Sequence, residues 1–242
     1  MIRKVYVIAL TLLASPVFSH SDGTVWERLG VADPVSILAW ASVISVLFIL
    51  ISIVYQKGMK EHAKKLSFVF ISVPVLIGTV YLSGATIYLN MVSATGGPVH
   101  WHADYEVWAC GVGYELVDPE GLENRVGSPT VHEHNDNRIH VEGVLLDLED
   151  ASMHEYFESV AGEFTGKRLS IPATDGQKTW TNGNLCNGLP ARWYMFVNGK
   201  MNIDMEEYII SPYADVPPGD RIKFVFSEKP ANEINPNLGV EP

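Results

Sequence analysis

Five of the eight histidines in this chain fall within 41 residues, at spacings that suit a metal ion. They form the pairs His100-x-His102 and His132-x-His134, followed by His140. Neutral imidazole is a common ligand for zinc and for copper. We therefore predict that these five histidines are metal ligands. The alternative is that they form a hydrogen-bonded polar cluster or a pH-sensitive face.

The residues that follow His100 alternate in polarity. His100, His102 and Asp104 share one parity, whereas the apolar residues Trp101 and Ala103 share the other. This period of two is typical of a half-buried strand, and its outer face would carry the ligands.

A hairpin is predicted over residues 130–134 and 138–146, with a loop at 135–137. If His132 pairs with His140, then Val131 pairs with Val141, so the histidines share one face and the valines share the other. A shift of one residue would mix the two sets. The pattern therefore favours the register with an odd-length loop.

The metal is predicted to be copper or zinc. The candidate ligands are nitrogens and carboxylates, with no cysteine or methionine close in sequence, and this set suits Cu(II) or Zn(II). Asp104 and Glu142 are possible ligands, or they could orient the imidazole N–H groups. Glu133 has the opposite parity and is not expected to bind the ion.

The first third of the chain is apolar and predicts a membrane anchor. The expected segments are a signal peptide at 1–19, an outer segment at 20–34, membrane helices at 35–55 and 66–92, and a cytoplasmic loop at 56–65. Four lysines in that loop indicate the cytoplasmic side. Cleavage after Ser19 would make His20 the N-terminus, either as a further copper ligand or simply as an exposed residue.

A linker at 93–99 then leads to an extracytoplasmic domain at 100–229 and a flexible tail at 230–242. Residues 96–242 contain 24 acidic and 10 basic side chains, a net charge of −14. This charge argues against nucleic acid as a partner, because phosphate binding needs a basic face. Outside the cytoplasm, Cys110 and Cys186 are expected to form one structural disulfide, with thiolate ligation of a metal as the alternative.

The predicted fold is α+β, a strand-rich domain with one main helix across a sheet, in a β-grasp-like layout. Residues 152–161 predict that helix, with Asp150 as the N-cap and Gly162 after its end. Its core-facing apolar stripe is expected to be Met153, Tyr156, Phe157, Val160 and Ala161. His154 lies off the apolar stripe and is expected to be solvated. Further strands are expected at 168–172, 193–197, 200–203 and 221–226.

The run from His100 to Gly111 resembles a largely uncharacterised family of membrane-anchored extracytoplasmic proteins of archaea and bacteria. The shared motifs are H-x-H-A-D-[FY], H-x-H, H-V-[HE]-x-G and V-N-G-K, which here begin at His100, His132, His140 and Val197. The resemblance covers residues 100–226. Some similar sequences carry a protein-disulfide isomerase label, but this chain has no C-x-x-C motif, so that activity is not transferred.

Three functions remain open at this stage. The first is a membrane-tethered protein that captures, stores or delivers copper or zinc. The second is a metalloenzyme that uses the same site, although H-E-x-x-H is absent. The third is an accessory subunit of a membrane complex, with structural histidines. The expected partners are the lipid bilayer and either such a complex or a metalloenzyme that receives the metal.

Overall fold

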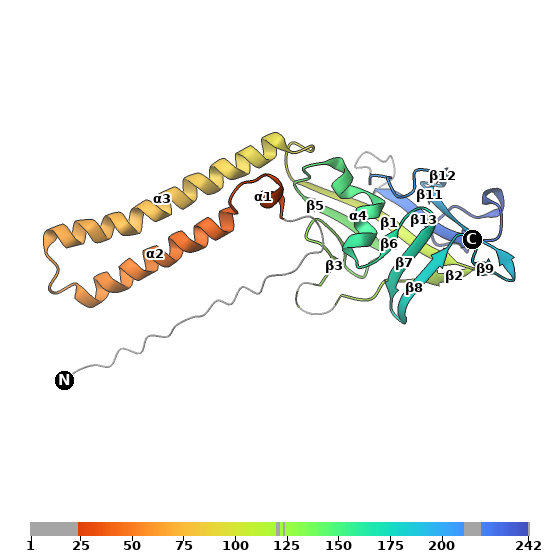
Figure 1. Ribbon diagram of the computed structural model, residues 1–242, viewed down its shortest axis with the longest axis horizontal. Coiled ribbons are helices and arrows are strands. Elements are labelled where there is room, and N and C mark those ends of the chain that lie inside the picture. Colours follow the sequence, from red (N-terminus) through yellow and green to blue (C-terminus); the bar gives the residue numbers. More distant parts are fainter. Residues whose placement is uncertain (1–23, 120–121, 123, 211–218, 242) are drawn as a thin grey trace.

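The computed structural model describes residues 24–119, 122, 124–210 and 219–241. A long helical hairpin projects from one end of a strand-rich domain (Figure 1). The chain is therefore α+β, as expected. Three helices precede the domain: α1 (Val25–Arg28), α2 (Pro34–Tyr55) and α3 (Glu61–Val92).

Helices α2 and α3 pack against each other through small residues. Gly78 faces Leu38 and Ala41, so a side chain at this position would meet the other helix. Asp33 caps α2 by accepting hydrogen bonds from the first backbone N–H groups, and Pro34 occupies the first turn. Both helices are long and apolar enough to cross a membrane, judged by length and composition.

Helix α3 begins earlier than the apolar pattern predicted. It starts at Glu61, so Lys64 and Lys65 are helical and not part of an irregular loop. The charged first turn is stabilised locally, because Lys64 forms an ion pair with Glu61 at 2.7 Å. Hydropathy alone marks the apolar part of a helix and misses such a polar extension.

One large sheet forms the centre of the domain. Its strands are β1 (Val99–Ala109), β2 (Val112–Tyr114), β3 (Val126–Gly127), β4 (Val131–Glu133), β5 (Arg138–Gly143), β11 (Arg192–Val197), β12 (Lys200–Asn202) and β13 (Asp220–Ser227). Their order is β12-β11-β13-β1-β5-β4-β3, and β2 pairs with β1. Strands β1 and β13 are parallel, whereas the other pairs are antiparallel.

The alternation predicted for β1 is confirmed. Ala103, Tyr105 and Val107 are buried on the inner face, whereas His102 and Asp104 lie on the other face. The inner face packs against helix α4 and a second sheet, which contains β6 (Glu163–Phe164), β7 (Arg168–Ala173) and β8 (Gly176–Thr181). The remaining elements are η1 (Leu148–Ala151), α4 (Met153–Ser159), β9 (Leu185–Cys186), β10 (Leu189–Pro190) and η2 (Ala231–Glu233).

Helix α4 is shorter than predicted and has a different cap. Ser152 accepts the capping hydrogen bond, whereas Asp150 lies in the preceding 3-10 turn η1. Met153, Tyr156, Phe157 and Val160 are buried, as the apolar spacing predicted. Ala161, also expected in this stripe, is exposed, because the chain turns there with a φ of 61°.

The C-terminal segment from residue 230, which was expected to be a flexible tail, is packed against the domain in this structure. Ile234 is buried beside Tyr194 and Phe196. The amine of Lys223 donates to the backbone carbonyls of Asn237 and Val240. A fully buried lysine needs such acceptors, and the tail supplies them.

Candidate metal centre

Three histidines form a row across three neighbouring strands. In the strand register, His102 of β1 lies opposite His140 of β5, and His140 lies opposite His132 of β4. Val131 pairs with Val141, so the predicted odd register is confirmed. The left-handed backbone at Asn135 and Asn137 makes the turn that this register requires.

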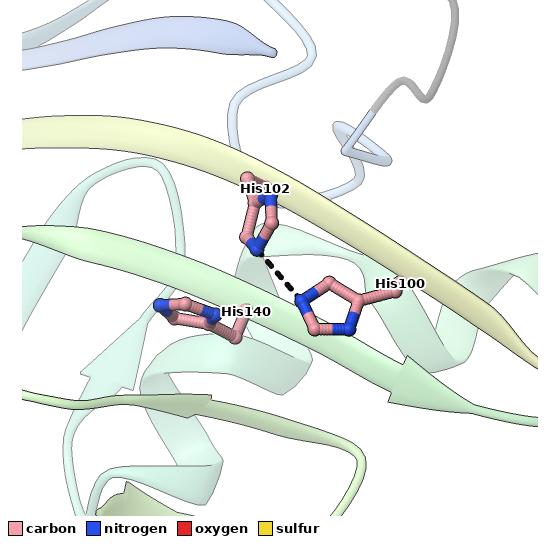
Figure 2. Close-up of side chains that lie close together, drawn as sticks. All are labelled: His100, His102 and His140. Atoms are coloured by element: carbon pink, nitrogen blue, oxygen red, sulfur yellow. Dashed lines mark hydrogen bonds between the residues drawn. The ribbon is translucent and has the colours of Figure 1, made fainter. Parts of the chain in front are cut away.

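His100, His102 and His140 offer nitrogen atoms that all lie within 4.8 Å of one another (Figure 2). Nε2 of His100 is 2.9 Å from Nε2 of His102. The ring of His140 lies 4.7 Å from the ring of His102, measured between centroids. Imidazoles from adjacent strands therefore converge, which is what a single ion with short bonds to each nitrogen needs.

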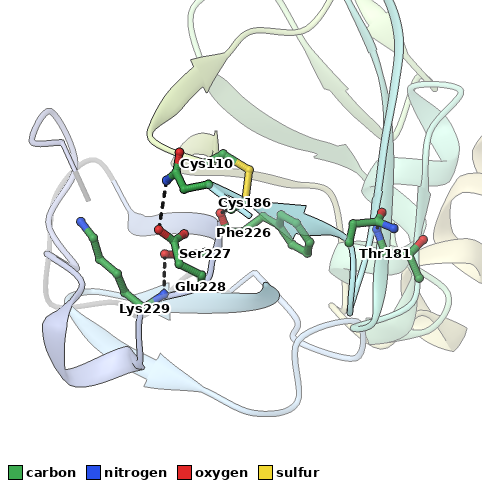
Figure 3. The surroundings of a disulfide bond; sticks show 9 residues. Cys110, Thr181, Cys186, Phe226, Ser227, Glu228 and Lys229 are labelled. Atoms are coloured by element: carbon green, nitrogen blue, oxygen red, sulfur yellow. Dashed lines mark hydrogen bonds between the residues drawn. A yellow bond between two sulfur atoms is a disulfide. The ribbon is translucent and has the colours of Figure 1, made fainter. Parts of the chain in front are cut away.

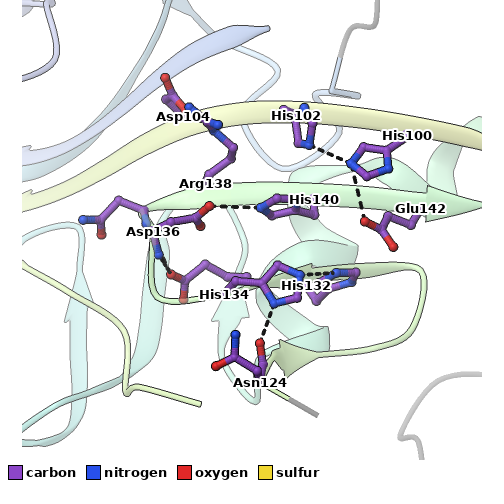
Figure 4. Close-up of polar contacts among 12 residues, drawn as sticks. His100, His102, Asp104, Asn124, His132, His134, Asp136, Arg138, His140 and Glu142 are labelled. Atoms are coloured by element: carbon purple, nitrogen blue, oxygen red, sulfur yellow. Dashed lines mark hydrogen bonds and ion pairs between the residues drawn. The ribbon is translucent and has the colours of Figure 1, made fainter. Parts of the chain in front are cut away.

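His132 and His134 form a second pair on the other side of His140. Their Nε2 atoms are 3.1 Å apart, and the ring of His134 lies 4.8 Å from that of His140. Nδ1 of His134 donates a hydrogen bond to the backbone carbonyl of Asn124 (Figure 4). All five predicted histidines are thus contiguous, with His140 at the centre.

Two carboxylates touch the histidines from the side. Asp136 lies 3.2 Å from Nε2 of His140, and Glu142 lies 3.5 Å from Nε2 of His100 (Figure 4). Carboxylates in such positions orient an imidazole and raise its basicity. Glu142 was an expected contributor. Asp136 was not, because the spacing of the histidines gives no signal that a turn residue folds back onto them.

Asp104 and Glu133 have other partners. Asp104 accepts a hydrogen bond from Nε of Arg138 at 2.7 Å. Glu133 is buried and accepts from the backbone N–H groups of Asp136 and Asn137, so it stabilises the turn, in agreement with its predicted opposite parity. His154 of α4 is exposed, as expected, and lies outside this group. His20 lies outside the described residues.

Burial keeps the central imidazoles in the form that binds metals. The pKa of His132 is lowered from 6.5 to about 4, first by burial and then by the nearby His134. The pKa of His102 is also lowered, by burial and by the positive charge that His140 and His100 would carry. Near neutral pH, His102 and His132 are therefore uncharged and have a lone pair for a ligand.

Two buried nitrogen atoms in the cluster lack a hydrogen-bond partner among the described residues. They are Nδ1 of His132 and Nδ1 of His140. Buried polar atoms are nearly always satisfied in folded proteins, so these two call for an explanation. For Nδ1 of His140 a metal ion would supply one, because an unprotonated imidazole nitrogen is a ligand atom.

The predicted disulfide between Cys110 and Cys186 is present (Figure 3). Cys110 directly follows β1, and Cys186 ends β9, so the bond joins the main sheet to the loop that precedes β11. The backbone N–H of Cys110 also donates to the carbonyl of Phe226 in β13. Both sulfurs are therefore part of a structural disulfide and are not metal ligands.

Comparison of the chain with protein-family models, with curated proteins and with solved structures finds no match in any of the three.

Proposed function

We propose that this chain is a membrane-anchored protein that binds copper or zinc outside the cytoplasm, for capture, storage or delivery. The observation that carries the proposal is the convergence of His100, His102 and His140, with nitrogen atoms within 4.8 Å of one another on two paired strands. Imidazole nitrogen with a carboxylate nearby is a donor set that both Cu(II) and Zn(II) accept.

The compartment and the anchor belong to the same proposal. A disulfide supports an oxidising compartment. Helices α2 and α3 would form the anchor, with the lysine-rich connection on the cytoplasmic side. Only six residues separate the end of α3 at Val92 from the start of β1 at Val99. The histidine face would then lie close to the bilayer, within reach of a membrane-bound recipient of the metal.

We also propose a β-grasp-like layout for the domain. In such a fold, the first and last strands are parallel neighbours at the centre of a mixed sheet crossed by a helix. Strands β1 and β13 have this arrangement, with β5 beside β1 and β11 beside β13. Helix α4 follows β5 and precedes β11 in the chain and packs on the core face.

A cavity of the domain that lies away from the histidines favours binding over catalysis. A cavity of about 580 Å³ is lined by residues of β1, β2 and the turn between β7 and β8, and none of the five histidines lines it. A metalloenzyme would need a substrate cavity beside the ion.

Metal analysis of the purified full-length protein in detergent tests the proposal. The protein carries no affinity tag and has the substitution His20→Ala. Cleavage after Ser19 then cannot create an N-terminal histidine that binds copper. We expect at least one equivalent of Cu(II) or Zn(II), and a rise in melting temperature when the ion is added. His102→Ala with His140→Ala should lower the affinity at least tenfold.

His154→Ala is the matched control, because this histidine is exposed on helix α4 and lies outside the cluster. It should bind metal like the parent protein. The proposal is overturned if the parent binds no metal, or if the control and the double variant lose affinity equally.

A further inference from the structure

The five histidines form two groups that share one ring. His100 and His102 contact His140 from the β1 side, with ring centroids 6.3 and 4.7 Å from its centroid. His132 and His134 contact it from the β4 side, at 5.7 and 4.8 Å. His140 is therefore the common member of two groups of three imidazoles.

Each outer pair is joined by a hydrogen bond between its imidazoles, at a spacing that two ligands on one ion would also have. The Nε2 atoms are 2.9 Å apart in the first pair and 3.1 Å apart in the second. With bonds of about 2.0–2.1 Å, neighbouring nitrogen ligands on a single ion lie roughly 2.9–3.4 Å apart, for right-angled to tetrahedral arrangements. Both pairs fall within this range without any rearrangement of the strands.

The two pairs approach His140 from opposite sides. Strands β1 and β4 flank β5, so their backbones are separated by two strand spacings, about 9.5 Å. The group of nitrogen atoms within 4.8 Å of one another consists of His100, His102 and His140 and does not include the second pair. One ion on each pair therefore accounts for all five histidines.

The hydrogen bonds of the second pair resemble those around metal-bound histidines. Nδ1 of His134 donates to the carbonyl of Asn124, which leaves Nε2 of the neutral ring unprotonated and aimed at His132. Ligating histidines commonly donate their other N–H to a backbone carbonyl in this way. At the centre, Nε2 of His140 faces Asp136, and Nδ1 is the buried atom without a hydrogen-bond partner among the described residues.

We infer that this face binds two transition-metal ions side by side, one on His100 and His102 and the other on His132 and His134, with His140 between them. This inference rests on the proposed function and adds a second ion, His132 and His134 being outside the group that converges on the first. Two adjacent sites around one shared imidazole would let an ion pass from the buried end of the row, at His132, to the exposed end, at His100.

Stoichiometry of Cu(II) binding to the full-length His20→Ala protein in detergent tests the inference. We expect two equivalents per chain. His132→Ala with His134→Ala should leave one equivalent, and so should His100→Ala with His102→Ala. His140→Ala should lower the affinity for both Cu(II) ions. His154→Ala should bind two Cu(II) ions with unchanged affinity.

Electron paramagnetic resonance gives a readout that does not depend on variants. The spectrum at one equivalent of Cu(II) should show isolated ions, and dipolar broadening should appear as the second equivalent is added. If the parent protein binds only one equivalent, and the His132→Ala, His134→Ala protein binds that equivalent at unchanged affinity, the two-ion inference is overturned and the proposed function stands. Two equivalents without dipolar coupling also overturn it. No binding at all overturns both.

Discussion

At the scale of single residues, the histidines are distinguished by how deeply they are buried. His132 is only 2% exposed, whereas His100 is exposed. Burial of an imidazole without a charged partner favours the neutral ring, and this explains the lowered pKa of His132. Burying an imidazole in the sheet face costs free energy unless its polar atoms have partners there.

The depressed pKa of His132 predicts a pH dependence of stability in metal-free protein. Between about pH 4 and pH 6.5, the unfolded ring binds a proton that the folded ring does not. Stability should therefore fall as the pH falls through this window. His132→Gln removes this contribution, so its stability should fall less between pH 7 and pH 5.

Denaturant unfolding in a chelator checks this prediction. The pKa values of Glu133 and Glu155 are raised by burial, which gives the opposite slope, but both groups are present in the two proteins. The difference between the proteins therefore isolates His132. Equal slopes in the parent and the variant would contradict the assignment.

At the scale of elements, a glycine directly before β13 allows the close approach of β1. Gly219 precedes β13 with a φ of 136°, and a Cβ atom here would overlap the backbone carbonyl of His102. The close approach of the two strands at this point therefore requires glycine. The backbone that carries His102 is held by this contact.

Gly219→Ala should destabilise the domain and loosen the site. The strained backbone alone costs about 1–3 kcal/mol, and the overlap would push β1 away at His102. We expect a lower denaturation midpoint and weaker metal binding. Gly113→Ala is the control, because a Cβ there meets the ring of Trp108 at an ordinary 3.8 Å. Equal effects of the two substitutions would refute this explanation.

The disulfide joins elements that are far apart in the sequence. Cys110 and Cys186 are separated by 76 positions. Replacing both with serine should lower the free energy of unfolding by about 2–5 kcal/mol. Metal stoichiometry should stay the same in folded protein, because the bond lies about 26 Å along β1 from His102 by strand rise. Denaturant unfolding and metal analysis of the Cys110→Ser, Cys186→Ser protein measure the two quantities. A loss of metal together with retained stability would show that the cysteines serve the site.

At the scale of the whole molecule, the N-terminal helices and the domain are in direct contact. Arg28 of α1 forms ion pairs with Asp147 and Asp150 at 2.9 and 2.8 Å. The backbone N–H of Ala94, just after α3, donates to the carbonyls of Leu145 and Leu146. These contacts orient the domain relative to the helical hairpin, which projects from the end where β5 finishes (Figure 1).

The proposed orientation in the membrane predicts the outcome of reporter fusions. Alkaline phosphatase, which is active only outside the cytoplasm, should be active when fused after residue 241. It should be inactive when fused after Lys60, in the lysine-rich connection. The reverse pattern would place the histidine face in the cytoplasm and exclude the proposed compartment. Measured activity is normalised to the amount of each fusion protein.

The strand faces, the two long helices and one hairpin follow from local sequence patterns. The parity of residues 100–107 and the valines that flank the hairpin determine which face carries the histidines, because successive side chains in a strand point to opposite sides. The apolar runs determine the two long helices, and the turn at Asn198 and Gly199 determines the β11–β12 hairpin. Period and turn chemistry are local properties, so the sequence displays them directly.

Only the tertiary structure decides which strands are neighbours and which polar groups fold back on the site. Strand β1 pairs with β13, which lies more than a hundred residues later in the chain, and with β5, and no local pattern encodes either pairing. The contact of Asp136 with His140, the carbonyl of Asn124 beside His134 and the packing of the C-terminal segment around Lys223 depend on it too. The sequence therefore determined which face of each strand carries its imidazoles. Strand order decided that they form two groups around His140, because that order places β5 between the other two strands.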